Sequence, residues 1–203
     1  MFFRFASPCD NTYNRAAYVN ALCEKAGIGY IIDLADNGAE ADVYFEDDSL
    51  NVPYRKYMYK NSKIVLLDIF GYYGDMSYDK AVAEAMRAII ANDGPFLIHC
   101  TEGKDRTGFV CALLEALCGA SIKEITKDYM KTYSNYYGID EKSDKETYDS
   151  VIEVIFEDIL CTIAGVNNVS MINQDNLASG AMNYLRFGGM SDNEIAQLLV
   201  KIK

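Results

Sequence analysis

The sequence contains a single histidine, His99, among 203 residues. A zinc site built from several imidazoles, or the two-histidine helix of a metalloprotease, is therefore excluded. A serine–histidine–aspartate triad would have to use His99 itself, which is held next to Cys100 in the chain. We expect His99 to support the neighbouring backbone by hydrogen bonding rather than to act as a general base.

Basic residues and long apolar runs are also scarce. The chain has 19 basic against 30 acidic residues, a formal net charge of −11, and no cluster of lysines or arginines. An acidic surface repels nucleic acid and anionic membranes, so we expect neither as a partner. No run approaches the roughly 18 apolar residues of a membrane helix, and Met1–Phe5 does not resemble a secretory signal peptide. We expect a soluble protein without stable membrane insertion, cytoplasmic or secreted with its signal absent from this chain; its oligomeric state stays open.

The cysteines follow neither the spacing of a zinc site nor the pattern of a small disulfide-rich domain. No other group of ligand-type residues stands out, so we expect no metal and no cofactor. The six cysteines are Cys9, Cys23, Cys100, Cys111, Cys118 and Cys161.

The stretch His99–Gly108, with the sequence His-Cys-Thr-Glu-Gly-Lys-Asp-Arg-Thr-Gly, carries most of the chemical information. It follows the apolar run Phe96–Ile98, which predicts a buried strand, and precedes the apolar segment 109–118, which predicts a helix. Cys100 therefore lies at the end of a strand, and Arg106 follows six residues later at the start of a helix. This geometry suits binding of a tetrahedral anion and attack on it.

The physical basis is the unpaired N–H groups and positive dipole end of a helix N-terminus, which favour an oxyanion. The same surroundings favour the thiolate form of Cys100, which is nucleophilic at neutral pH. Arg106 offers two donors to phosphate oxygens. Thr107 can donate its hydroxyl to the sulfur when sulfur leaves, and Gly103 and Gly108 permit tight backbone turns.

Two other loop types are excluded. A nucleotide-binding P-loop needs a glycine where Ile98 stands and a serine or threonine where Asp105 follows the lysine. A thioredoxin-type site needs a second cysteine at position 103, which is glycine.

The Cys-x5-Arg pattern between His and Thr-Gly resembles the signature of cysteine-based phosphatases, the protein-tyrosine phosphatase superfamily. The variant with Gly-Lys-Asp-Arg resembles the bacterial atypical tyrosine/lipid phosphatases. The segments Phe3–Pro8 and Ile31–Leu34, and the tail Tyr184–Leu198, are also similar to that group, although Phe5 stands where serine is usual. The resemblance implies a phosphatase that acts on phosphate monoesters through a phosphocysteine on Cys100. The alternative is a phosphate-binding pseudophosphatase without turnover.

Three aspartates are candidates for the general acid that protonates the leaving group. The resemblance favours Asp105, because an aspartate at this place of the loop is taken as the acid in the Lys-Asp-Arg group and in myotubularin-type lipid phosphatases. Asp75 and then Asp68 are the alternatives, since both lie in the Gly/Tyr-rich stretch before the next helix. Asp105 could instead form an ion pair that only shapes the loop, and Asp75 could merely precede a helix N-cap at Ser77.

The loop residues Thr101, Glu102, Gly103, Lys104 and Arg106 are the predicted phosphate- and substrate-binding residues. Lys104 could recognise a second anionic group, as in phosphoinositide-directed relatives, whereas the acidic body favours a small or peptide phosphate. Expected partners are therefore phosphorylated proteins or peptides, or a phosphoinositide.

The order of elements predicts an α/β fold, protein-tyrosine-phosphatase-like, with a central parallel-rich sheet flanked by helices. We expect one domain over 1–203, although two small lobes are possible, with a helical C-terminal part at about 121–203. Further strands are expected at Tyr30–Leu34 and Lys63–Ile69, and 38–48 as loop or short helix. Capping boxes at Ser121, Ser143 and Ser191 support the later helices. The expected helices are Asn14–Ala26, Tyr78–Ala91, 122–134, 144–163, 174–187 and 192–201.

Overall fold

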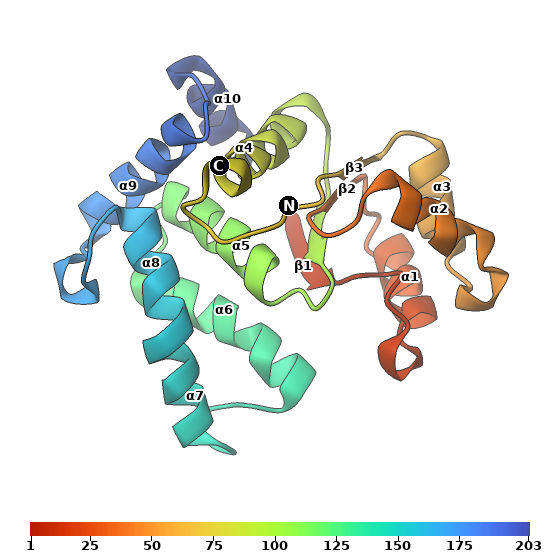
Figure 1. The fold of residues 1–203 in the computed structure, drawn as a ribbon, viewed down its shortest axis with the longest axis horizontal. Helices are drawn as coiled ribbons and strands as arrows, with labels where there is room; N and C mark the ends of the chain where they lie inside the picture. Colours follow the sequence, from red (N-terminus) through yellow and green to blue (C-terminus); the bar gives the residue numbers. More distant parts are fainter. The chain divides into compact units, whose positions relative to one another are not determined.

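The computed structural model describes residues 1–203, apart from the side chain of Asp48. The chain forms two compact units (Figure 1). Unit 1 comprises Met1–Phe70 and Glu84–Thr107, and unit 2 comprises Gly71–Ala83 and Gly108–Lys203. Helices α4 (Met76–Ala91) and α5 (Asp105–Leu117) each begin in one unit and end in the other.

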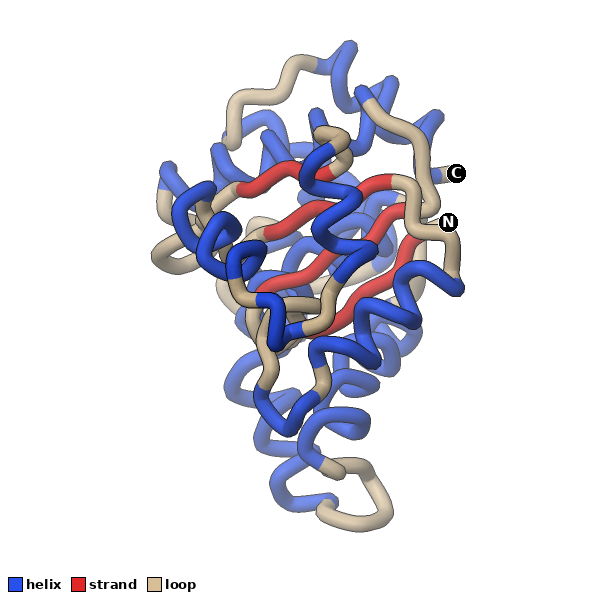
Figure 2. Tube along the Cα trace, turned by 90° about the vertical axis from the view of Figure 1, so that its right-hand side faces the viewer, coloured by secondary structure: helices blue, strands red, loops and turns tan.

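Unit 1 contains a parallel sheet in the order β1-β4-β2-β3, seen side by side in Figure 2. The strands are β1 (Phe2–Ala6), β2 (Tyr30–Asp33), β3 (Ile64–Leu66) and β4 (Phe96–Cys100). All residues of β4 are buried, as its unbroken apolar run predicts for a central parallel strand. The expected α/β, phosphatase-like fold is thus confirmed. β1 was not anticipated as a strand, because its Phe-Phe-Arg-Phe pattern lacks alternation and only pairing with β4 defines it.

The helices of unit 1 follow the sheet strands in the chain. They are α1 (Ala16–Lys25), α2 (Gly38–Glu46) and α3 (Pro53–Lys60), with short 3₁₀ turns at Thr12–Asn14 and Asp48–Leu50. The acidic stretch 38–48 is mostly helical because Asn37 and Glu40 form a capping box. A core cluster joins α1, α3, β2 and β4 through Val19, Cys23, Ile28, Ile31, Met58 and Leu97.

Unit 2 is helical over most of its length, as the sequence predicts. Its later helices are α6 (Ile122–Tyr137), α7 (Lys145–Val151), α8 (Glu157–Ala164), α9 (Gln174–Phe187) and α10 (Asp192–Ile202). A π-helical segment, Ile152–Phe156, joins α7 to α8, and a 3₁₀ turn lies at Val169–Met171. Phe109 is fully buried among the rings of Tyr73, Tyr78 and Tyr184, with centroid distances of 5.0–5.7 Å.

Two predicted helix starts were wrong. Ser121 and Ser191 form the expected capping boxes. Ser143 does not, because its hydroxyl donates to the Gly138 carbonyl, and Asp144 caps α7 instead by accepting from the Thr147 amide. Likewise Ser77 lies inside α4, which begins at Met76 directly after Asp75. In the first case the neighbouring aspartate took the capping position.

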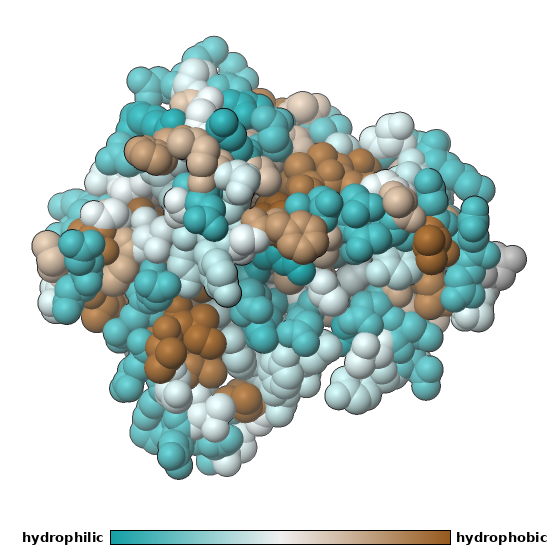
Figure 3. Space-filling model, viewed as in Figure 1, coloured by the Kyte–Doolittle hydropathy of each residue, from teal (hydrophilic) through white to brown (hydrophobic). Residues whose placement is uncertain are grey.

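Polar and charged side chains cover most of the surface in Figure 3, as the excess of acidic residues predicts. A hydrophobic patch within unit 2 lies over the segment that joins α7 to α8. Val154 of this segment is 71% exposed.

The packing of α8 against α9 depends on Gly180. A Cβ at this position would lie 2.5 Å from the Ile163 carbonyl oxygen and 2.6 Å from the Ala164 Cα atom, both rigid backbone. We therefore predict that Gly180→Ala lowers the free energy of unfolding by about 1–3 kcal/mol, because the helices must move apart. Thermal unfolding checks this. Ser179→Ala, one residue away on the exposed side of α9, is the matched control and should change stability little; equal stability of both variants would contradict the packing argument.

Candidate active site

The strand–loop–helix geometry around Cys100 is that anticipated from the sequence. Cys100 ends β4 and is buried, residues 101–104 form the loop, and α5 begins at Asp105. Gly103 has a φ of +72°, and a Cβ there would lie 2.4 Å from the Phe5 carbonyl oxygen. Only glycine fits this close approach of the loop to β1.

Donors outside the loop hold its carbonyl groups. The Thr101 carbonyl accepts from the Ser7 amide at 3.0 Å and from Arg15 Nη2 at 3.4 Å. The Gly103 carbonyl accepts from Arg4 Nη2 at 3.1 Å. Because C=O and N–H point in opposite directions across a trans peptide, the amides that follow Thr101 and Gly103 point the other way.

Arg106 is held by backbone carbonyls at the carboxyl ends of two neighbouring strands. Its Nη1 donates to the Ile69 carbonyl at 3.2 Å and to the Leu34 carbonyl at 3.4 Å, and its Nη2 donates to Thr101 Oγ1 at 3.2 Å. The guanidinium therefore has a defined orientation beside the loop. Such fixed donors stabilise charge that develops on an oxyanion.

Thr107 follows Arg106 in the first turn of α5 and is fully buried. Its Oγ1 has no hydrogen-bond partner among the described residues. A buried hydroxyl without a partner is costly, which fits a group kept for a transient acceptor.

His99 lies between two oxygen atoms in the interior of unit 1. Its Nε2 is 3.5 Å from Asp33 Oδ2 and its Nδ1 is 3.4 Å from the Cys100 carbonyl oxygen. Burial lowers the pKa of His99 to about 4, although the charge of Asp33 opposes this shift. The imidazole is therefore neutral at pH 7, and its Nδ1 lies beside the backbone at the start of the loop.

Sequence reasoning missed the buried charges next to His99. Arg55 of α3 forms an ion pair with Asp33, and its Nη2 lies 3.9 Å from Asp36 Oδ2. Burial would raise the pKa of Asp33, but His99 and Arg55 lower it to about 2. Burial and the Asp33 charge raise the pKa of Asp36 to about 7. Arg55 stands in no motif, so only the tertiary structure could reveal it.

The exposed charges of the loop form their own ion pairs. Lys104 Nζ lies 3.1 Å from Glu102 Oε2 and 3.5 Å from Asp105 Oδ2. The Asp105 side chain is 62% exposed in the first turn of α5. The ion pair considered from the sequence is thus present, and it leaves the carboxylate accessible to solvent.

The other two acid candidates have different surroundings. Asp68 follows β3 with a φ of +46°, and its Oδ2 accepts from Asn37 Nδ2 at 3.4 Å. Its Oδ1 is buried without a hydrogen-bond partner among the described residues. Asp68 also precedes Ile69, whose carbonyl holds Arg106. Asp75 belongs to unit 2, where its Oδ2 accepts from the Tyr72 amide at 3.2 Å and closes a turn.

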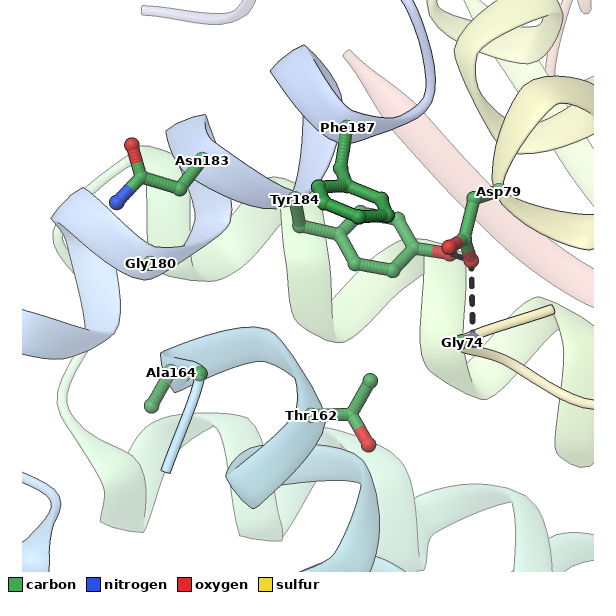
Figure 4. Close-up of a pocket in the computed structure, with 9 residues that line it drawn as sticks. Gly74, Asp79, Thr162, Ala164, Gly180, Asn183, Tyr184 and Phe187 are labelled. Atoms are coloured by element: carbon green, nitrogen blue, oxygen red, sulfur yellow. Dashed lines mark hydrogen bonds between the residues drawn. The ribbon is translucent and has the colours of Figure 1, made fainter. Parts of the chain in front are cut away.

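Unit 2 also contains a cavity of about 340 Å³. Figure 4 shows the Tyr184 hydroxyl and the Gly74 amide directed at Asp79, with the Phe187 ring beside that of Tyr184. Burial and the hydrogen bond to Asp79 raise the pKa of Tyr184. None of the residues that the sequence indicates as catalytic lines this cavity. The lining residues are Gly74, Asp79, Thr162, Ala164, Gly165, Gly180, Asn183, Tyr184 and Phe187.

Among the described residues, no group of three or more histidine, cysteine, aspartate or glutamate side chains could hold a metal ion. No helix formed by the described residues is both long and apolar enough to cross a membrane.

The sheet, the buried cysteine at its central strand and the arginine at the following helix define an α/β protein with a phosphatase-like fold. Residues 2–202 match the tyrosine phosphatase family, and the chain belongs to this family. Over 122 residues it is 30% identical to a tyrosine-protein phosphatase of Nostoc commune, an alignment that covers 57% of this chain. The aligned part is 42% of that relative, so the chain spans less than half of its length.

Because His99 is the single histidine, its ring resonances report on this site without ambiguity. We predict that nuclear magnetic resonance detects no protonation of His99 between pH 8 and 5, because its folded-state pKa is about 4. The unfolded chain in urea should titrate near 6.5. Since the unfolded state then binds more protons, stability contributed by neutral His99 falls as pH drops from 6.5 towards 4. A midpoint at or above 6.5 in the folded protein would refute this assignment.

Proposed function

We propose that this chain hydrolyses phosphate monoesters through a covalent phosphocysteine on Cys100. The observation that carries the proposal is that one strand–loop–helix segment contains both a buried cysteine at the end of β4 and an arginine whose guanidinium is held by backbone carbonyls. The loop amides described above would bind the remaining phosphate oxygens. Membership of the tyrosine phosphatase family supports the same activity.

In the first step the Cys100 thiolate attacks phosphorus. The sulfur–phosphorus bond forms as the bond to the leaving oxygen breaks, and a protonated carboxyl gives its proton to that oxygen. Arg106 and the loop amides stabilise the charge on the equatorial oxygens.

In the second step water attacks the phosphocysteine and the sulfur–phosphorus bond breaks. The carboxylate that lost its proton takes one from the water, and inorganic phosphate leaves. The Thr107 hydroxyl donates a hydrogen bond to the departing sulfur. Its lack of a partner in the resting protein supports this role.

Phosphotyrosine is the proposed substrate class, because the matched family and the relative from Nostoc commune are both named as tyrosine phosphatases. Phosphoserine, phosphothreonine and phosphoinositides are the proposed alternatives. Lys104 would contact a second anionic group in the last case, although it already has two carboxylate neighbours. Dual specificity would appear as comparable kcat/KM values for phosphotyrosine and phosphoserine peptides.

The alternative function is phosphate binding without turnover. It would keep the same loop and Arg106 but lack an effective acid or nucleophile. Binding of a phosphopeptide without hydrolysis by fully reduced protein would favour it.

We predict that Cys100→Ser lowers kcat for an aryl phosphate by roughly 10³-fold or more, because the hydroxyl is a much weaker nucleophile than the thiolate. Acid quenching of a reaction with ³²P-labelled substrate should trap label on the wild-type protein and none on the variant. Cys161→Ser, which changes a half-buried cysteine of α8, is the control and should retain the rate. Equal rates for Cys100→Ser and wild type would reject the nucleophile.

For the general acid we propose Asp105, which precedes Arg106 at the start of α5 and whose side chain is exposed. Asp105→Asn should lower kcat by about 10²-fold or more for phenyl phosphate, a poor leaving group, and much less for p-nitrophenyl phosphate. Asp68→Asn and Asp75→Asn are measured alongside. If either of these shows that leaving-group dependence and Asp105→Asn does not, that residue is the acid.

A further inference from the structure

Arg55 is a deeply buried cationic side chain of unit 1, with 1% of its surface exposed. It comes from α3, outside every motif of the sequence. Its backbone amide donates to Asn20 Oδ1 of α1 at 3.0 Å, so a buried polar contact also fixes the backbone from which it extends. A buried guanidinium is expensive unless it is paired, and removing its partner or the cation itself leaves an uncompensated charge.

One chain of contacts leads from Arg55 to the cysteine. Arg55 Nη2 pairs with Asp33 Oδ2, and the same oxygen lies 3.5 Å from His99 Nε2. His99 Nδ1 then lies 3.4 Å from the Cys100 carbonyl oxygen. A neutral imidazole has one ring proton, so it donates to one of its two oxygen neighbours, while both limit where the ring can lie.

A second chain of contacts leads from the same carboxylate to Arg106. Asp33 Oδ1 accepts from the amides of Ala35 and Asp36, each at 3.0 Å, and so fixes the turn after β2. Leu34 lies within this turn, and its carbonyl accepts from Arg106 Nη1 at 3.4 Å. The Leu34 amide also donates to the His99 carbonyl at 2.9 Å.

Both chains require an ionised Asp33 inside the protein. Asp36 is a second carboxyl within reach of the same cation, and Cys9 lies against Arg55 as well. Without Arg55, two buried acidic groups would face one another beside His99 with no cation between them. The carboxylate would then either take up a proton or turn towards water, and each change weakens its hydrogen bonds.

We propose that Arg55 is a positioning residue that acts through Asp33 to orient both the Cys100 backbone and the Arg106 guanidinium. Its effect on catalysis rests on the proposed phosphatase function, whereas its effect on oxyanion binding does not. Binding of inorganic phosphate to the loop therefore tests the positioning role even if turnover is absent.

The experiment compares full-length Arg55→Met, Arg55→Lys and wild type. For Arg55→Met we expect the Kd for inorganic phosphate, measured by calorimetry, to rise by about tenfold to a hundredfold, because small misplacements of binding groups have effects of this size. kcat/KM for an aryl phosphate should fall by at least as much. Arg55→Lys, which keeps the charge but loses the fork, should lie between wild type and Arg55→Met.

The His99 resonance supplies a readout that a merely structural role would not move. The Arg55 charge disfavours a protonated imidazole, so its removal should raise the titration midpoint of His99 in Arg55→Met. Met58→Ala is the matched control, because Met58 is also 1% exposed on α3 and its loss creates a cavity without touching the ion pair. It should lower stability but keep the phosphate Kd and the His99 midpoint.

The proposal is overturned if folded Arg55→Met binds phosphate as tightly as Met58→Ala and shows an unchanged His99 midpoint. Should Arg55→Met not fold, Asp33→Asn decides, since both chains of contacts pass through that carboxylate. Wild-type phosphate affinity in folded Asp33→Asn would equally overturn the positioning role. If the wild-type protein binds phosphate but does not hydrolyse the aryl phosphate, that result counts against the proposed phosphatase function alone.

Discussion

The parallel pairing of β4 between β1 and β2 is the constraint on which the site depends. Its register places Ala6 beside Cys100 and Asp33 beside His99, so the strand ends on either side meet the loop where it begins. Because the strands are parallel, their carboxyl ends lie at one edge of the sheet, where ligands of open α/β sheets bind. The loop can then take its donors from β1 and its acceptors from the turns after β2 and β3.

The net charge of −11 would seem unfavourable for an anion site. The local arrangement removes the difficulty, because cations contact the loop directly: Arg4, Arg15, Lys104 and Arg106. Electrostatic effects fall off within about 10 Å at moderate salt, so distant carboxylates have little effect here. Arg15 and Lys104 also pair with nearby carboxylates, those of Asp10 and Glu102. Arg4 and Arg15 donate to loop carbonyls, which orients the following amides towards the opposite side. We therefore propose an oxyanion site at this loop within an otherwise acidic protein.

The sequence was informative wherever local rules decide the structure. The strand before Cys100, the helix from Asp105 and the capping boxes at Ser121 and Ser191 follow from periodicity and capping chemistry. β1 and Arg55 could not be foreseen, because their roles exist only through partners distant in the chain. Ser143 failed for a different reason, since two adjacent residues could both cap and the aspartate was the one that did.

The three candidate acids differ in how their carboxyl groups are placed, and a general acid has two requirements. A general acid has to reach the leaving oxygen and also hold a proton until the reaction. The Asp105 carboxylate is exposed to solvent, and its Oδ2 lies 3.5 Å from Lys104 Nζ. Asp68 has one buried carboxylate oxygen and a left-handed backbone conformation, both of which cost free energy. Residues with such strained backbones are often found at functional sites. Asp33 is the opposite case, because the paired Arg55 guanidinium helps to keep it ionised in the interior. The buried carboxylates of Asp33 and Asp36 thus lie beside Arg55, whereas the three candidate acids contact other partners.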